Sequence, residues 1–428
     1  MNKKLPTRSF MKKIVSIAPV VLCLAMVMLC LAGCTGTSAE TGEGQNTDPM
    51  LDAVLHIQYI DPVSLSEETF ATDSGEHTVR MLFVNAGKAD CIILEADGQT
   101  YLIDTGEDNS VPKILAGLAY METKSIAGVF LTHTDKDHIG GWDAILQAYP
   151  VEKLYTAVIR EAPDTYLKLA GEIPYETLMP GQSVPIGEEG LYLDVLCPIR
   201  LYPDEENNNS LILRLDCGEE TVLFAGDMKA EEEADLLSTG YDLDCTVLKV
   251  PYHGRKDGSG EAFLAACSPN LSIICCDTET DPDTAHKKAV ARLREYGEVR
   301  LTEDTDLGWY VTLEGKFRYI SNAQIIAERT ADLCLESVSI ADQTVTIRNN
   351  GVTADLSGYY MHSDRGNEVY VFPTGTVLAA GESITVGCVG TNGDLLWKGE
   401  TSVWHKSKED NAVLYDRFGN MLDTAAAK

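Results

Sequence analysis

The chain has 428 residues, 44% of them hydrophobic, which is enough for two or three globular domains. Its formal net charge of -32 at pH 7 excludes attraction of nucleic acids or other polyanions by the overall electric field of the protein. A role with such a partner would need a local metal or basic patch, and an acidic balance of this kind most often means a soluble, exposed surface.

The N-terminal 33 residues predict a signal peptide. Five Lys or Arg residues precede an apolar run, and the small residues of LAGC end at Cys34, an order typical of secretion signals. LAGC resembles the lipobox of bacterial lipoproteins, where cleavage before the cysteine is coupled to lipid attachment on its sulfur. An uncleaved signal anchor is the alternative, because the apolar run is nearly long enough to span a bilayer. In both cases we expect the rest of the chain at the outer face of a bacterial cell membrane.

Residues 34–50 are acidic and rich in Gly, Ser and Thr, which predicts a flexible tether. From about 78 to 320, apolar strand-like runs alternate with helical patterns. Helices are expected near 111–121, 140–148, 230–237, 260–266 and 284–296. Hairpins mixed with βα units predict mixed sheets flanked by helices, and we therefore assign residues 51–325 to an αββα sandwich.

The stretch LTHTDKDHIGG, residues 131–141, has two histidines and two aspartates in six consecutive positions after the apolar run VFL. A loop at the carboxyl end of a rigid strand can aim several side chains at one point. Imidazole nitrogens and carboxylate oxygens together suit Zn, Mn or Fe, and two such ions can share a site and supply a hydroxide near neutral pH. A solvated turn is the alternative, but the chain has only eight histidines in all. The stretch therefore predicts a binuclear metal site.

Residues 133–138, His-Thr-Asp-Lys-Asp-His, resemble the HxHxDH hallmark of the metallo-β-lactamase superfamily, in the variant HxDxDH. With the Gly-Gly pair that follows, this variant is similar to the ComEC-like branch, which includes the hydrolase domains of DNA-uptake channels. Further motifs follow in the order of that branch: FVNAGKADCIIL, LIDTG, NNNSLIL, FAGD and KVPYHG. The resemblance covers residues 78–320 and implies a metal-dependent hydrolase with a metallo-β-lactamase sandwich fold.

Transferred position by position, the resemblance implies ligands for two divalent ions, Zn or Mn. His133 and Asp135 would face one metal, and Asp137 and His138 would face the other. Asp227, in the FAGD turn after a strand, would bridge the two ions.

Two further histidines come from the same transfer. His253 of KVPYHG would be either a metal ligand or a general acid. His286, in DTAHKKAV, either completes the site or is an exposed histidine at the start of a helix. Asp137, Asp227 and His253 are the residues expected to take part in catalysis.

The chain also departs from the pattern of the branch. Asn85 and Lys88 stand where the opening motif usually has Asp and Gln, and Tyr252 replaces the first His of HHG. This tyrosine would weaken one metal or place a phenol against an oxyanion. Asp90 and Asp104 are retained, and Asp104 is expected to orient a ligand histidine.

From about residue 332 the chain is strands and turns rich in Gly and Asn, which predicts an all-β sandwich over 331–425. The stretches TVTIRNNGVTADLSGYYMHSD, VYVFPTGTVLAAGESITV and NAVLYDRFGNMLD resemble the lamin-tail domain, with Tyr359 where Trp is usual. The resemblance implies an Ig-like module that binds nucleic acid, protein or a cell surface and has no chemistry of its own. Trp397 and Trp404 are either contact residues or part of its packed core.

These features predict an exported hydrolase tethered to the membrane by lipid on Cys34. We expect a phosphodiesterase or nuclease that uses a hydroxide held by two metal ions, with nucleic acid among its phosphodiester substrates. One alternative is a lactone or ester hydrolase of the same fold. The other is a non-catalytic surface-binding protein that acts through its C-terminal module.

Overall fold

The structure, a computed structural model, describes residues 77–428 except 160–162, 315–316, 325–330 and 367. The predicted signal peptide, Cys34 and the tether over 34–50 lie outside the described residues. Within the described part of the chain, no helix is both long and apolar enough to cross a lipid bilayer.

The first sheet has eight strands and contains antiparallel and parallel pairs. Its order is β15 (Phe317–Ala323), β14 (Gly308–Glu314), β1 (Thr78–Val84), β2 (Ile92–Ala96), β3 (Gln99–Ile103), β4 (Ile126–Leu131), β5 (Leu154–Thr156) and β6 (Tyr175–Thr177). Pairs from β15 to β3 are antiparallel, and pairs from β3 to β6 are parallel. Asp97 and Gly98 join β2 to β3 with φ of 49° and 82°, as a type I′ hairpin turn requires.

The second sheet has seven strands. Its order is β13 (Glu298–Leu301), β12 (Leu271–Ile274), β11 (Val247–Lys249), β10 (Glu220–Phe224), β9 (Ile212–Cys217), β8 (Tyr192–Cys197) and β7 (Ser183–Pro185). Strands β10 to β13 are parallel, and β7 to β10 pair antiparallel. The inner parallel strands β11 and β12 are short and buried, as expected where helices cover the outer face.

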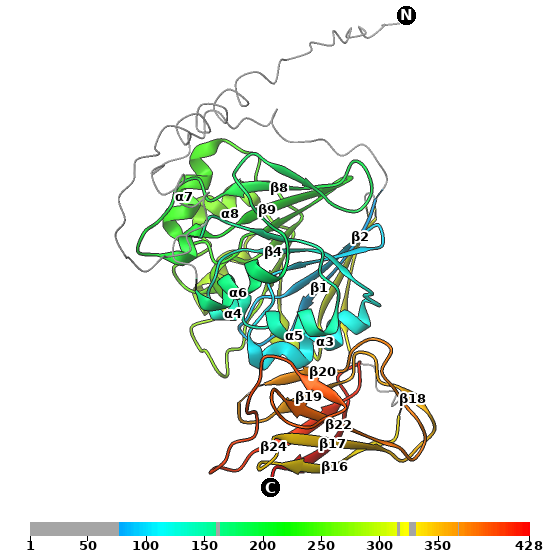
Figure 1. Ribbon diagram of the computed structural model, residues 1–428. Helices are drawn as coiled ribbons and strands as arrows, with labels where there is room; N and C mark the ends of the chain where they lie inside the picture. Colours follow the sequence, from blue (N-terminus) through cyan, green and yellow to red (C-terminus); the bar gives the residue numbers. More distant parts are fainter. Residues whose placement is uncertain (1–76, 160–162, 315–316, 325–330, 367) are drawn as a thin grey trace, which may run out of the picture. The chain divides into compact units, whose positions relative to one another are not determined.

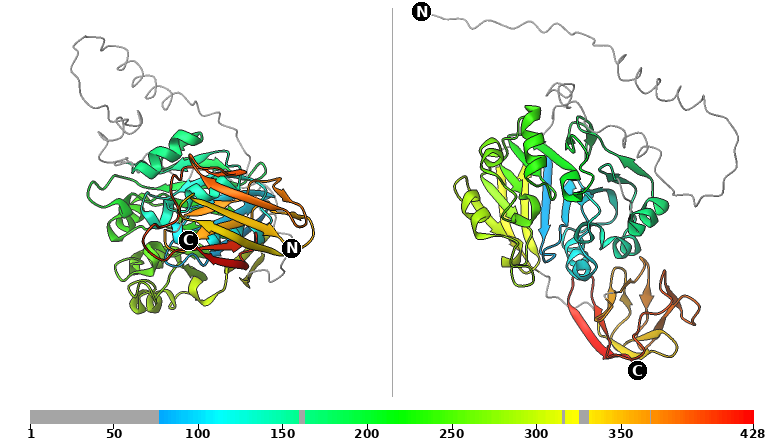
Figure 2. Two further views of the ribbon diagram at one scale, coloured as in Figure 1. Left: turned by 60° about the horizontal axis from the view of Figure 1, so that its bottom comes forward. Right: turned by 90° about the vertical axis from the view of Figure 1, so that its left-hand side faces the viewer.

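The two sheets pack face to face with helices outside them, in the order α, β, β, α (Figures 1 and 2). Between the sheets, fully buried side chains from the first sheet meet those from the second, among them Phe83, Leu94, Leu213 and Phe224. Helices α3 (Val111–Tyr120) and α5 (Trp142–Ala148) cover the first sheet. Helices α7 (Ala230–Thr239), α8 (Glu261–Cys267) and α9 (Lys287–Leu293) cover the second. The predicted αββα sandwich is confirmed.

Four of the five expected helices lie where the sequence places them, but the fifth was predicted too long. Helix α9 spans Lys287–Leu293 rather than 284–296, and His286 is its N-cap residue. Helix α6 (Asp164–Glu172) and the short helix α4 (Lys136–Ile139) inside the metal motif were not predicted as helices.

The C-terminal strands form β-sheets only. One has the order β16 (Leu333–Ser339), β17 (Thr344–Asn349), β22 (Ser383–Cys388) and β23 (Leu395–Trp397); another has β20 (Val369–Val371), β19 (Tyr360–Ser363), β24 (Asn411–Tyr415) and β25 (Met421–Ala426); β18 (Ala354–Asp355) pairs with β21 (Val377–Leu378). Tyr359, Trp397 and Trp404 are buried in one core, and the two indole rings lie edge to face with centroids 5.9 Å apart. The tryptophans are therefore core residues rather than surface contact residues.

Candidate metal centre

Three loops carry the predicted ligand residues, and each follows a buried strand. Strand β4 leads into residues 132–139, β10 leads into Gly226 and Asp227, and β11 leads into the 3-10 helix η5 (Pro251–Gly254), which holds His253. All three are strands with parallel neighbours, so their carboxyl ends offer the edge at which α/β proteins commonly build sites.

The loop after β4 is shaped by the Gly-Gly pair that ends the motif. Asp135 precedes helix α4 in an extended conformation, with φ -63° and ψ 148°, while Asp137 and His138 lie inside the helix. A Cβ on Gly140 would lie 2.6 Å from the Lys136 carbonyl oxygen, and one on Gly141 would lie 2.1 Å from the Thr105 carbonyl oxygen. Only glycine lets this turn pack so closely, which fixes the direction of the ligand side chains.

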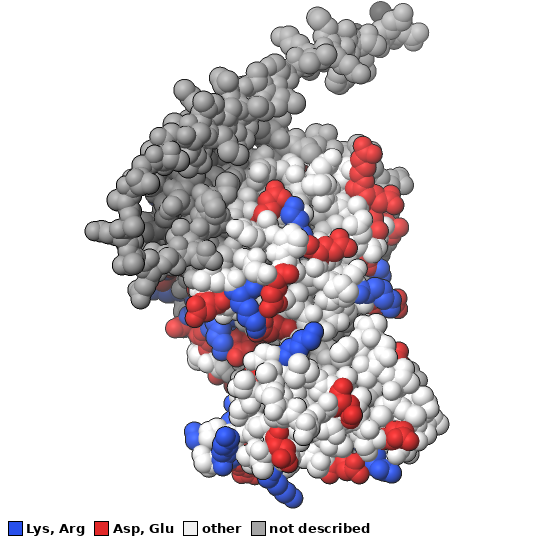
Figure 3. Space-filling view, viewed as in Figure 1, with Lys and Arg blue, Asp and Glu red and all other residues white. Residues whose placement is uncertain are grey.

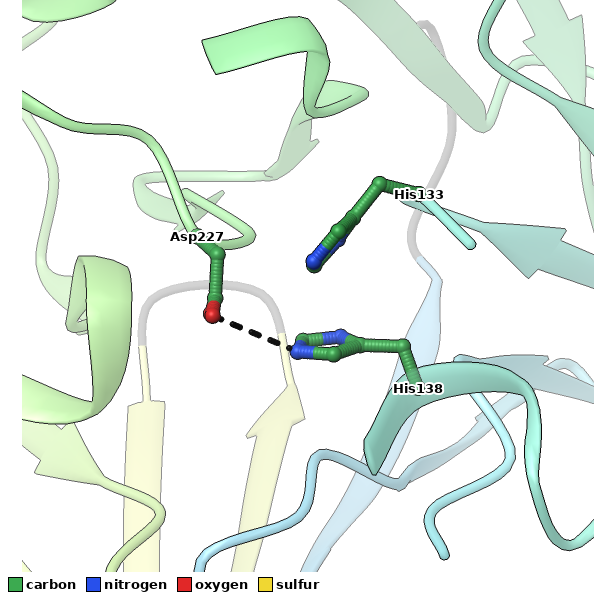
Figure 4. A group of neighbouring side chains, drawn as sticks. All are labelled: His133, His138 and Asp227. Atoms are coloured by element: carbon green, nitrogen blue, oxygen red, sulfur yellow. Dashed lines mark ion pairs between the residues drawn. The ribbon is translucent and has the colours of Figure 1, made fainter. Parts of the chain in front are cut away.

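Asp227 lies among the imidazoles of the cluster. Its Oδ2 lies 3.4 Å from His138 Nε2 and 3.1 Å from His253 Nε2. The Asp137 Oδ2 lies 3.6 Å from His253 Nε2, and the rings of His133 and His138 lie 4.0 Å apart. Figure 4 shows His133, His138 and Asp227 pointing toward one another. The structure therefore brings five of the seven predicted ligand residues into one cluster.

Several polar atoms of this cluster have no hydrogen-bond partner among the described residues. They are His133 Nε2, His138 Nε2, both ring nitrogens of His253, Asp227 Oδ1 and Asp90 Oδ1, and all are buried. Buried polar atoms without partners are costly, so a set of them aimed at one point calls for a bound group. A donor set of imidazole nitrogens and carboxylate oxygens fits divalent Zn or Mn.

Asp104 orients His138, as the sequence predicted. Its Oδ2 lies 2.7 Å from His138 Nδ1, and it accepts hydrogen bonds from both the backbone N and the Oγ1 of Thr132, each at 2.7 Å. The carboxylate therefore directs His138 Nε2 toward Asp227, the geometry by which acidic residues position histidine ligands.

Asp90 lies on the other side of the cluster and pairs with Lys249, which the sequence analysis did not single out. Asp90 Oδ1 lies 3.5 Å from His253 Nδ1, and its Oδ2 forms an ion pair with Lys249 Nζ. Both side chains of the ion pair are buried. The available signal was the lysine that ends the apolar strand VLK and begins the motif KVPYHG.

The carboxylates hold protons on two of the imidazoles. Burial lowers the pKa of His253, but Asp227 and Asp90 outweigh it and raise that pKa to about 9. Burial likewise opposes protonation of His138, yet Asp227 and Asp104 raise its pKa well above the usual value. Burial alone would raise the pKa of Asp227, whereas His253 and His138 hold it well below its usual range.

Asp135 and His286 are less closely joined to the cluster. Asp135 Oδ2 lies 3.7 Å from His133 Nε2, but the Asp135 side chain is 48% exposed and lies at the rim. His286 lies in none of the groups of neighbouring metal-binding side chains found among the described residues. Its Nδ1 instead accepts a hydrogen bond of 3.2 Å from the Lys288 backbone N and caps helix α9.

Lys88 and Tyr252, two of the departures, also lie near the cluster. Lys88 Nζ lies 3.1 Å from Asp137 Oδ2, and its side chain is half-buried. The Tyr252 ring contacts two cations, with Lys229 Nζ 5.2 Å and the Arg255 guanidinium carbon 5.4 Å from its centroid. Three cations therefore lie against Asp137 and Tyr252.

One known protein family matches part of this chain. Residues 84–278 match the family described as the Metallo-beta-lactamase superfamily. This match and the α, β, β, α order of layers identify the fold as the metallo-β-lactamase fold. Proteins with this fold generally hold divalent metals, often two, and generally act as hydrolases.

Curated relatives resemble only part of this chain. ComE operon protein 3 of Bacillus subtilis (strain 168) is 28% identical over 178 residues, which are 40% of this chain and 23% of that protein. Recombination protein 2 of Haemophilus influenzae (strain ATCC 51907 / DSM 11121 / KW20 / Rd) is 28% identical over 239 residues, 54% of this chain and 27% of that protein. The matched part thus spans about a quarter of the length of these relatives. Among solved structures, the metallo-beta-lactamase fold protein YhfI from Bacillus subtilis is 10% identical with a TM-score of 0.38, over 58% of this chain and all of that one.

Proposed function

We propose that the protein is a metal-dependent phosphodiesterase whose centre is built by His133, Asp137, His138, Asp227 and His253. The observation that carries this proposal is the set of buried imidazole and carboxylate atoms that lack hydrogen-bond partners and face one another at the ends of β4, β10 and β11. Two divalent ions bound there would neutralise charge on phosphoryl oxygens and lower the pKa of water toward neutrality.

The chain's own residues would position the reactants. Asp227, which approaches both His138 and His253, would hold both ions. Asp104 holds the imidazole of His138 by a hydrogen bond from outside the cluster, and Asp90 lies 3.5 Å from His253 Nδ1 on the outer side of that ring. The half-buried Lys88 ammonium would contact a phosphoryl oxygen once an ion occupies Asp137, because the two compete for the same carboxylate oxygen.

The relatives support a nucleic-acid phosphodiester as one substrate to test, since one is named a recombination protein and another, of Neisseria gonorrhoeae, a competence protein. The charge on the visible surface gives this less support. On the face in Figure 3, Lys and Arg side chains lie beside Asp and Glu rather than forming a continuous basic surface among the described residues. A short or single-stranded phosphodiester needs less of such a surface than a duplex does.

The test is hydrolysis of bis(p-nitrophenyl) phosphate by the full-length protein after chelation, with Mn or Zn then added back. We expect activity that returns with metal and that is lost in the Asp135→Ala, His138→Ala double variant. Asp143→Asn, a change at an exposed carboxylate of α5, is the matched control and should retain activity. Metal binding without phosphodiester hydrolysis would refute the proposed substrate class and direct the assay to lactones and esters. Absence of metal binding would refute the enzyme and favour a surface-binding protein.

We further propose that the chain is exported and carries lipid on Cys34, and that residues 331–425 form a lamin-tail-like binding module. The sequence LAGC and the all-β C-terminal strands support these assignments. Replacement of Cys34 by Ala should release the protein from the membrane fraction of a bacterial host, and intact mass measurement should show the lipid only on the wild-type chain.

A further inference from the structure

Lys249 is the last residue of β11 and is only 1% exposed. A lysine is almost never buried in this way unless charges or hydrogen bonds compensate it. Only Val250 separates it from η5, so it lies beside the cluster at the carboxyl end of a parallel strand.

The Lys249 ammonium contacts two other loops of the site. It forms the ion pair with Asp90 and donates a hydrogen bond of 3.1 Å to the carbonyl oxygen of Gly226. Its Nζ also lies 4.0 Å from Asp227 Oδ1. The Lys249 side chain therefore links the β1–β2 turn to the turn that carries Asp227.

Asp90 in turn contacts two of the proposed ligand residues. Its Oδ1 lies 3.5 Å from His253 Nδ1, and its backbone N donates a hydrogen bond of 3.0 Å to the Asp137 carbonyl oxygen. Asp90 therefore faces His253 Nδ1 as Asp104 faces His138 Nδ1, but across 3.5 Å rather than through a hydrogen bond of 2.7 Å. Without Lys249, however, Asp90 would keep a buried charge with no strong cation beside it.

The balance of charge in the site also points to a role for Lys249. Five carboxylates lie in or against the cluster, those of Asp90, Asp104, Asp135, Asp137 and Asp227. One buried ammonium and two divalent ions would carry an equal positive charge, with the imidazoles neutral. Loss of the ammonium would leave an excess negative charge in a buried region, where uncompensated charge is costly.

Resting on the proposed metal centre, we propose that Lys249 is its positioning residue. Through Asp90 it holds His253 in a ligating orientation, and through the Gly226 carbonyl it holds the turn of Asp227, so that the centre keeps two divalent ions. The role is positioning, because Lys249 itself does not reach the substrate side of the cluster.

The test measures bound Mn and Zn per chain, and their affinities, in the full-length wild-type protein and in three variants. Lys249→Met removes the ammonium, Asp90→Asn removes its partner, and the double variant removes both charges while leaving an oxygen at position 90 for His253 Nδ1. Lys136→Met is the matched control, because that lysine lies in the metal motif but pairs outward with Glu107 and Asp108.

We expect Lys249→Met to weaken the second ion by about tenfold to a hundredfold, the range seen when partners of metal ligands are removed. The double variant should regain most of that affinity, and its Co-substituted form should regain the visible absorption spectrum of the wild type. Lys136→Met should bind metal as the wild type does. Wild-type stoichiometry and affinity in Lys249→Met would overturn the inference, as would a folded double variant that binds no better than Lys249→Met. This test measures metal binding and not hydrolysis. A wild-type protein that binds two ions but cleaves no phosphodiester would therefore refute the proposed function without refuting this inference.

Discussion

Raising the pH should destabilise the metal-free protein through His253. The folded chain holds the pKa of His253 at about 9, because Asp227 and Asp90 outweigh its burial, against 6.5 in the unfolded chain. Below pH 6.5 both states are protonated, and the full stabilising contribution of these contacts is present. Between pH 6.5 and 9 only the folded state keeps the proton, so the free energy of unfolding falls as the pH rises.

The size of this effect follows from the pKa difference. Each pH unit between the two pKa values costs about 1.4 kcal/mol, so the loss from His253 by pH 9 is about 3 kcal/mol. For a domain of this size, about 2–4 °C of melting temperature corresponds to each kcal/mol, which predicts a fall of roughly 6–12 °C. His138, whose pKa is also raised, would steepen the slope further.

The assay is thermal unfolding of the full-length protein in EDTA, followed by circular dichroism at pH values from 6 to 9. Metal-saturated protein should lack this slope, since bound metal requires neutral imidazoles, and the apparent metal affinity should rise over the same range. His253→Gln is the control. In the metal-free variant, the fall of stability with pH should be smaller by the amount that corresponds to about one proton. Equal slopes in the wild type and in His253→Gln would refute the protonated state assigned to His253.

Three further changes test other parts of the structure. Gly226→Ala should lower the free energy of unfolding by about 1–3 kcal/mol and weaken metal binding, because Gly226 has φ +45° and a Cβ would lie 2.9 Å from Ser210 Cβ. The melting temperature and the amount of bound metal would check this. Lys88→Gln should raise KM for a phosphodiester about threefold to fivefold with kcat nearly unchanged, since a half-buried surface cation contributes up to about 1 kcal/mol; steady-state kinetics with the Lys88→Arg variant alongside would show whether charge is the cause. Trp404→Ala should destabilise the C-terminal β-sheets by about 3–5 kcal/mol, because the ring is 1% exposed and packs against Trp397; calorimetry should detect this without a change in bound metal.

The sequence predicted this cluster through the resemblance of its ordered motifs to the metallo-β-lactamase superfamily, and each of the clustered residues follows a strand. His133, Asp137 and His138 come directly after β4, Asp227 follows β10, and His253 follows β11. Alternation of apolar runs with helices predicts parallel strands, and the carboxyl ends of parallel strands share an edge. The order of the motifs was therefore enough to assign them to one site, without any interatomic distance.

Tertiary hydrogen bonds decided what the sequence could not. The helical pattern begins at Thr284, but the backbone N of Ala285 donates to the His253 carbonyl oxygen at 2.8 Å, and that of His286 donates to the Gly254 carbonyl oxygen at 2.9 Å. Ala285 takes a φ of +40° to do so, and the helix therefore begins later. Lys249 is a similar case, because its burial depends on Asp90, which lies far away in the sequence.

Tyr252 raises the question of whether this centre lacks a ligand that HHG would supply. The backbone answers it locally: Tyr252 and His253 both have positive φ, 52° and 50°, and this turn directs their side chains differently. His253 faces Asp227 and Asp90, whereas the Tyr252 ring contacts Lys229 and Arg255. Strain of this kind persists only where the surroundings impose it, and here it aims a single histidine into the cluster. The Tyr252 ring therefore lies against two cations, and His253 is the residue of this turn that faces the cluster.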